Sequence, residues 1–154
     1  MYIIIVLLLM FVLPALSVVN ERYFLGSDAG LLLLTGKWFV FWGVGIRLIS
    51  AGARQAMNPK YTAETILGLK TSESWVVVRE LGFANIAIGT VALGSIHAHH
   101  WLTPAALAGT IFYGLAGVQH LVTKNRNRLE NVAMLSDLFA CSILSAYCLA
   151  VVAR

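Results

Sequence analysis

The stretch WVVVRELGFANIAIGTVALGSI, residues 75–96, decides the fold class. It is 22 residues long, and its only charged residues, Arg79 and Glu80, stand near its start. An α-helix rises about 1.5 Å per residue and the hydrocarbon core of a bilayer is about 30 Å thick, so roughly 20 apolar residues cross it. The stretch therefore predicts a transmembrane helix.

Four more apolar stretches of similar length lie on either side of this one. The predicted spans are Tyr2–Val19, Leu31–Ser50, Trp75–Ile96, Pro104–Val122 and Val132–Val152. They predict an all-α polytopic transmembrane helix bundle of five helices, or of four if the N-terminal apolar segment does not span. No repeat or linker divides the chain, so residues 1–154 are expected to form a single transmembrane helical domain.

Two of these assignments depend on local detail. The first segment has no basic start and no small-residue cleavage site, so we expect it to be retained rather than removed as a signal peptide. The second span could instead run over Trp38–Met57, because Lys37, Trp38 and Trp42 resemble interfacial anchors. We prefer the shallower placement. Between spans two and three, Thr62-Ala63-Glu64 predicts the start of a short surface helix.

The composition excludes several classes of protein. Hydrophobic residues make up 59% of the chain and charged residues 12%, whereas a soluble domain has about 45–50% and 25%. A water-soluble globule and a disordered chain are therefore excluded. The 11 Lys and Arg residues are too few and too dispersed for a nucleic-acid surface. The lipid bilayer is the expected partner.

The basic residues predict the orientation. One side of the membrane would receive Arg47, Arg54, Lys60, Lys70, Arg79, Lys124, Arg126 and Arg128. The other side would receive Arg22, Arg154 and, in one placement, Lys37. Because cytoplasmic loops carry an excess of Lys and Arg, we expect a cytoplasmic N-terminus and a C-terminus on the opposite side.

Small residues recur along two of the predicted helices. Gly82, Asn85, Gly89 and Ala92 share one face of the third span, and Ala106, Thr110 and Gly114 share one face of the fourth. Membrane helices associate by close packing at such positions. We interpret both faces as helix contacts, formed within the bundle, in a homo-oligomer or with a membrane complex partner.

Ionisable and amide side chains of the predicted spans fall in the cytoplasmic half under this topology. They are Arg47, Arg54, Arg79, Glu80, Asn85, His120 and Asp137. A charge at the bilayer centre costs about 2.5–3.5 kcal/mol on insertion scales, so such groups usually pair or face a cavity. Two interpretations stay open: structural ion pairs with snorkelling arginines, or a ligand or ion site. We expect Glu80, His120 and Asp137 to form one buried network with Arg47 or Arg79.

The sequence gives little evidence for a metal site or a catalytic site. His97, His99 and His100 are weak metal candidates, because no carboxylate or thiol partner stands nearby in the sequence. The chain shows no nucleophile motif or phosphate loop, and we expect no catalytic residue and no cofactor. A lipid-modifying enzyme that uses Glu80, His120 or Asp137 is the weakest hypothesis.

Three motifs resemble a known family. They are Arg79-Glu80-Leu81-Gly82-Phe83-Ala84-Asn85 with Gly89, Phe112-Tyr113-Gly114-Leu115-Ala116-Gly117 followed by His120, and Ser136-Asp137. Between Gly45 and Phe139 the chain resembles the domain-of-unknown-function family numbered 6790, which comprises small bacterial multi-pass membrane proteins. The resemblance implies a fold and motif residues but no activity. Family members are typically four-helix proteins, so the first apolar segment is a departure.

These observations lead to one main expectation about function and one competing expectation. The main one is a non-enzymatic integral membrane protein, a homo-oligomer or accessory subunit, in the bacterial inner membrane. The alternative is a small channel or transporter for a proton, an anion or a small polar ligand, which would use the cytoplasmic-side polar cluster.

Overall fold

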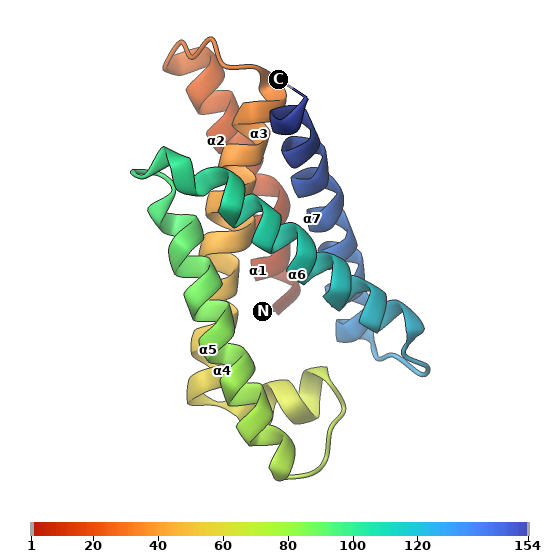
Figure 1. The fold of residues 1–154 in the computed structure, drawn as a ribbon. Coiled ribbons are helices and arrows are strands. Elements are labelled where there is room, and N and C mark those ends of the chain that lie inside the picture. Colours follow the sequence, from red (N-terminus) through yellow and green to blue (C-terminus); the bar gives the residue numbers. More distant parts are fainter. Residues whose placement is uncertain (1, 154) are drawn as a thin grey trace.

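The computed structural model describes residues 2–153, and the described chain is helical without β-strands (Figure 1). The helical segments in order are α1 (Tyr2–Leu7), η1 (Leu8–Val12), α2 (Leu13–Val19), η2 (Asn20–Phe24), α3 (Leu31–Phe39), η3 (Val40–Ile46), α4 (Arg47–Met57), η4 (Tyr61–Ile66), α5 (Glu73–Gly94), η5 (His99–Trp101), α6 (Leu102–Val122) and α7 (Arg128–Val152). Segments η1 to η4 are π-helical and η5 is a 3₁₀ turn.

Several of these segments join end to end into longer helices. In residues 2–153, five continuous helices are long and apolar enough to cross a membrane. Their bounds are Tyr2–Phe24, Leu31–Met57, Glu73–Gly94, His99–Val122 and Arg128–Val152. The five-helix form of the sequence prediction is thereby confirmed, and the chain has the architecture of a multi-pass membrane protein.

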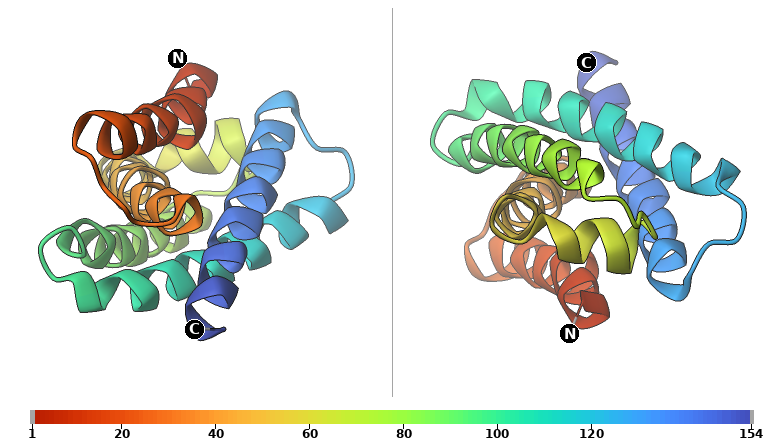
Figure 2. Two further views of the ribbon diagram at one scale, coloured as in Figure 1. Left: turned by 90° about the horizontal axis from the view of Figure 1, so that it is seen from above. Right: turned by 90° about the horizontal axis from the view of Figure 1, so that it is seen from below.

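The helices pack mainly in two antiparallel pairs. Helix α4 lies along α5, and α6 lies along α7 (Figures 1 and 2). The first helix rests on α3 and η3, and its outer side exposes apolar side chains such as Ile4, Phe11 and Leu16. A buried core that includes Met10, Val40 and Leu144 joins the elements.

Glycines set the distance between α5 and the second long helix. A Cβ on Gly89 would lie 2.8 Å from the carbonyl oxygen of Gly45, and a Cβ on Gly82 would lie 2.8 Å from that of Gly52. A larger residue at either α5 position would collide with backbone, which cannot yield as a flexible side chain can. The predicted small face of the third span is therefore a helix contact inside this chain.

The small face of α6 differs from the prediction. Its buried row includes Ala106, Gly109, Tyr113 and Gly117, whereas Gly114 is half-buried against the thiol of Cys141 on α7. The predicted face is therefore rotated from the buried one, because Gly109 and Gly117 admit Val44 and Leu138 from neighbouring helices. Thr110, also half-buried, donates its hydroxyl to the carbonyl of Ala106 within α6.

The second long helix is longer than the preferred span of residues 31–50. It continues without a break to Met57, because Gly52 and Gln55 are buried against α5. A short helix forms at the predicted place as η4, after a turn at Asn58, but its Thr62 and Ala63 are buried rather than on the surface. Arg126 caps the end of α6, and Asn127 caps the start of α7 while its side chain donates to the carbonyl of Ile66 in η4.

A polar cavity between the helices

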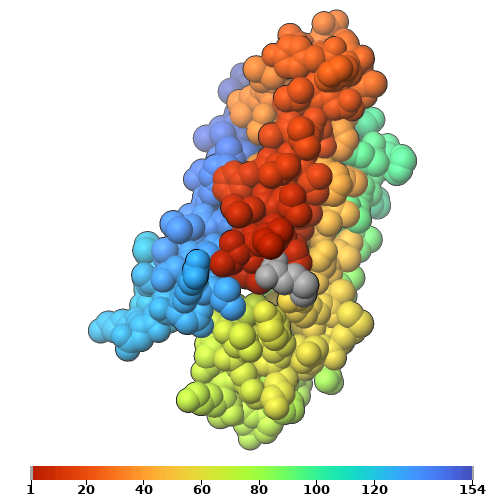
Figure 3. All heavy atoms as spheres, turned by 180° about the vertical axis from the view of Figure 1, so that it is seen from behind, coloured from red at the N-terminus to blue at the C-terminus, as the bar shows by residue number. Residues whose placement is uncertain are grey.

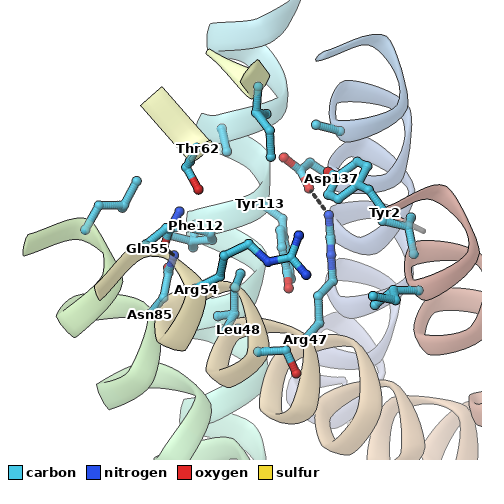
Figure 4. Close-up of a pocket in the computed structure, with 18 of the residues that line it drawn as sticks. Tyr2, Arg47, Leu48, Arg54, Gln55, Thr62, Asn85, Phe112, Tyr113 and Asp137 are labelled. Carbon is cyan, nitrogen blue, oxygen red and sulfur yellow. Dashed lines mark hydrogen bonds and ion pairs between the residues drawn. The ribbon is translucent and has the colours of Figure 1, made fainter. Parts of the chain in front are cut away.

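A cavity of about 220 Å³ lies where seven elements meet: α1, η1, α4, η4, α5, α6 and α7 (Figure 4). Seen from behind, the N-terminal end of the first helix lies between η4 and α7 on this side of the molecule (Figure 3). Most of the cavity wall is apolar. Its apolar side chains include Ile5, Val6, Leu9, Leu48, Ile66 and Phe112. The few charged and polar side chains of the wall are therefore surrounded by apolar side chains.

An ion pair joins α4 to α7 across this cavity. The Arg47 guanidinium donates from Nη2 to Oδ1 of Asp137 at 2.7 Å and to Oγ of Ser136 at 2.9 Å. The two charged side chains are only 12% and 9% exposed. Buried charges are tolerated when they are paired and hydrogen-bonded, so each group depends on the other.

Tyr113 supports this pair from α6. Its ring lies 4.8 Å from the Arg47 guanidinium, measured from the ring centroid, and its hydroxyl donates to the carbonyl of Gly43. Gly43 belongs to the π-helical segment η3, and π-helical turns often occur at functional sites. Tyr113 is 1% exposed. It therefore links the unusual helical turn of the second helix directly to the arginine.

Arg54 is the second cation of the cavity, two helical turns after Arg47 on the same face of α4. It lies 5.2 Å from the ring of Tyr61 in η4 and makes no ion pair or side-chain hydrogen bond with any residue in the described chain. Figure 4 shows its side chain extending into the cavity. With Arg47 neutralised by Asp137, the charge of Arg54 is left uncompensated.

An amide pair forms the polar corner of the cavity opposite α1. Asn85 Nδ2 donates to Gln55 Oε1 at 2.8 Å, which joins α5 to α4. Asn85 is 2% exposed, and its Oδ1 has no hydrogen-bond partner. Thr62 of η4, 6% exposed, lies at the same corner (Figure 4). A buried acceptor without a donor is uncommon in folded proteins.

The structure brings together most of the polar residues selected from the sequence. Those that line the cavity are Arg47, Arg54, Asn85, His120 and Asp137. Arg79 and Glu80 are exposed on α5 and do not line it. The expectation that Glu80 belongs to a buried network is wrong, because the buried face of α5 runs through Val78, Gly82 and Asn85 instead.

The three histidines of the loop before α6 are not gathered into a cluster of metal ligands in the part of the chain that the structure describes. His97, His99 and His100 are all exposed. Within residues 2–153, no group of three or more His, Cys, Asp or Glu side chains is arranged to hold a metal ion.

Sequence reasoning missed several polar residues of the cavity, among them Gln55, Thr62 and Tyr113. Gln55 lies beyond the preferred second span of residues 31–50, and Thr62 lies in the predicted surface helix. Tyr113 belongs to the glycine-rich motif of α6, and the sequence pattern predicts no role for it. A continued helical face through Arg47 and Arg54 is the one signal that could have placed Gln55 beside the cluster.

Comparison with protein families assigns the chain to a family. The model of a family of unknown function, DUF6790, matches residues 1–153. The match extends beyond the region of the motifs and includes the first helix. Neither curated proteins nor solved structures gave a significant match.

Proposed function

Since the chain belongs to the DUF6790 family, whose function is unknown, we propose a function from the cavity: this integral membrane protein binds a small monovalent anion, as a small channel or transporter does. The observation that carries the proposal is Arg54, a guanidinium inside the cavity without an acidic partner in the described chain. Intramembrane charges are costly and usually pair with an opposite charge or face a polar cavity. An anionic ligand would supply that opposite charge.

The charges of the cavity favour a single negative charge on the ligand. Arg47 and Asp137 cancel, and Arg54 leaves one positive charge. A monovalent anion would neutralise it, whereas a divalent anion would bring an excess negative charge close to Asp137. Guanidinium groups bind carboxylate and phosphate oxygens through two parallel hydrogen bonds, so an oxyanion fits better than a halide.

The size of the cavity favours a small ligand. A water molecule occupies about 30 Å³ in the liquid, so 220 Å³ corresponds to roughly seven waters. That volume suits a short organic anion and is too small for a whole phospholipid. The apolar wall from α1 and α6 would cover the hydrocarbon part of such a ligand.

A binding measurement on the detergent-solubilised protein tests this proposal. We expect propionate to bind and to raise the melting temperature, because a ligand that binds only the folded state stabilises it. Succinate, a dianion, should bind more weakly. Arg54→Gln should weaken propionate binding about ten- to hundredfold, since it removes charge-assisted hydrogen bonds.

Arg79→Gln is the matched control, because Arg79 is a basic residue of the adjacent helix that lies outside the cavity. The Arg79→Gln protein should bind propionate with the same affinity as the unmodified protein. Failure of every monovalent oxyanion to bind, or unchanged binding in Arg54→Gln, would contradict the proposal. Flux of the bound anion into protein-containing liposomes then distinguishes a transporter from a receptor.

The homo-oligomer or accessory-subunit expectation stays a prediction with weaker support. The face of α5 that suggested it packs against Gly45 and Gly52 of the same chain. An oligomer would have to use another surface. Mass measurement in mild detergent decides its existence. Location in a bacterial inner membrane with a cytoplasmic N-terminus is likewise proposed, from the distribution of basic residues.

A further inference from the structure

We infer that the anion bound in this cavity also carries a hydrogen-bond donor, such as a hydroxyl group, which is recognised by the carbonyl oxygen of Asn85. The inference rests on the proposed function and specifies the class of ligand: a small hydroxylated monocarboxylate in preference to its plain analogue. It is carried by a different residue from the one that carries anion binding.

The first argument is the state of the Asn85 side chain. Its amide nitrogen donates to Gln55, and its carbonyl oxygen is buried with no partner in the described chain. A carbonyl oxygen only accepts hydrogen bonds, so a donor is the group that would satisfy it. Leaving such an acceptor unpaired is unfavourable, which makes the empty position selective for a ligand with a donor.

The second argument is the location of this acceptor relative to the cation. Arg54, Gln55 and Asn85 all line this cavity, and Gln55 accepts a hydrogen bond from Asn85 across to α5, so the cation and the amide pair face the same cavity. A carboxylate oxygen would be repelled by the Asn85 carbonyl oxygen. The anionic group must therefore lie at Arg54 while a separate donor on the same ligand reaches Asn85.

The third argument concerns the rest of the wall. Thr62 lies beside the amide pair, and its hydroxyl can both donate and accept, which suits a ligand hydroxyl (Figure 4). Phe112 and the α1 side chains Ile5 and Val6 complete an apolar surface. A short hydroxy acid with a hydrocarbon body matches all three parts: the guanidinium, the polar corner and the apolar wall.

Two pairs of probe anions test the inference on the intact protein in detergent. Lactate differs from propionate by one hydroxyl group, and mandelate differs from phenylacetate in the same way. We expect the hydroxylated member of each pair to bind about tenfold more tightly, because one hydrogen bond to a buried acceptor changes the affinity by about this factor. Asn85→Leu should abolish the preference by weakening the hydroxylated member. Asn20→Leu, at an exposed position of η2, should keep the preference.

The outcomes separate this inference from the proposed function. Equal binding within both pairs, with continued dependence on Arg54, overturns the hydroxyl inference and leaves anion binding intact. No binding of any of the four anions overturns the proposed function itself. If Asn85→Leu does not fold, Asn85→Ala removes the same carbonyl. A preference that survives in either variant overturns the role of Asn85.

Discussion

Arg47 and Asp137 are two charges that exist together in an apolar bundle because each neutralises the other. The guanidinium contacts the carboxylate, Ser136 and the ring of Tyr113, so it has partners in several directions. Removing one member leaves the other buried without compensation, which costs about 3–5 kcal/mol for a buried pair.

Asp137→Asn should therefore lower the free energy of unfolding by about 3–5 kcal/mol. Asp28→Asn makes the same chemical change at an exposed position and should have little effect. Glu21 is unsuitable as a neutral reference, because it pairs with Lys37 at 2.8 Å and accepts a hydrogen bond from Trp38. Chemical unfolding in detergent measures the difference. Equal stabilities of the two Asn variants would show that the pair contributes no net stability.

The residues of the cavity were predictable to different degrees. A charge in an apolar stretch is visible in any sequence, so Arg47 and Asp137 could be selected before the structure was known. The rotation of α5 that exposes Glu80 depends on where its glycines meet α4, and a single sequence does not show that contact. Gln55 becomes a buried group only through this same contact.

The pairing of α5 with the second long helix depends on glycines that face each other. At Gly82 and Gly89 a Cβ would meet carbonyl oxygens and amide nitrogens of the partner helix at 2.8–3.0 Å. Backbone atoms yield only if the helices separate. At Gly114 the close atom among residues 2–153 is the Cys141 sulfur at 3.1 Å, and a side chain can rotate away.

Gly89→Ala should therefore destabilise the bundle by about 1–3 kcal/mol, the usual cost of overpacking. Gly114→Ala is the matched control and should cost less. Melting temperatures of both variants in the same detergent test the prediction. A Gly89→Ala protein as stable as Gly114→Ala would mean that the α4–α5 spacing is not fixed by this contact.

The sequence predicts the presence of each helix better than it predicts where the helix ends. The five apolar stretches were found from hydropathy and length alone. The end of the second helix was misplaced because Arg54 and Gln55 are polar, and polarity near a predicted membrane boundary indicates a loop. Their burial comes from packing against α5 and η4, which local sequence does not reveal.

The two cavity-side loops lie at one end of the molecule. The Asn127 side chain of the α6–α7 connection bonds η4, so the residues around Lys60 and Lys124 belong to the same side of the membrane. The density of basic residues there predicts that this side is cytoplasmic.

Labelling of single cysteines in intact cells tests this orientation. With Cys141 and Cys148 replaced by serine, Lys60→Cys and Lys124→Cys should resist an impermeant thiol reagent. Asp28→Cys, in the exposed loop at the opposite end, should react. The reverse pattern would show that the orientation is inverted. Both lysines are exposed, so the substitutions leave the buried contacts intact.

The long separation of Arg47 and Asp137 along the chain imposes an order on biosynthesis. The two residues are 90 positions apart, and ribosomes add about 5–20 residues per second, so the arginine is made roughly 5 to 20 s before its partner. During that interval the second helix carries a charge that nothing in the nascent chain neutralises. Its ion pair with Asp137 forms only after the last helix has been made, and a chain that stops before Asp137 presents an arginine without this partner to the cell's membrane quality control.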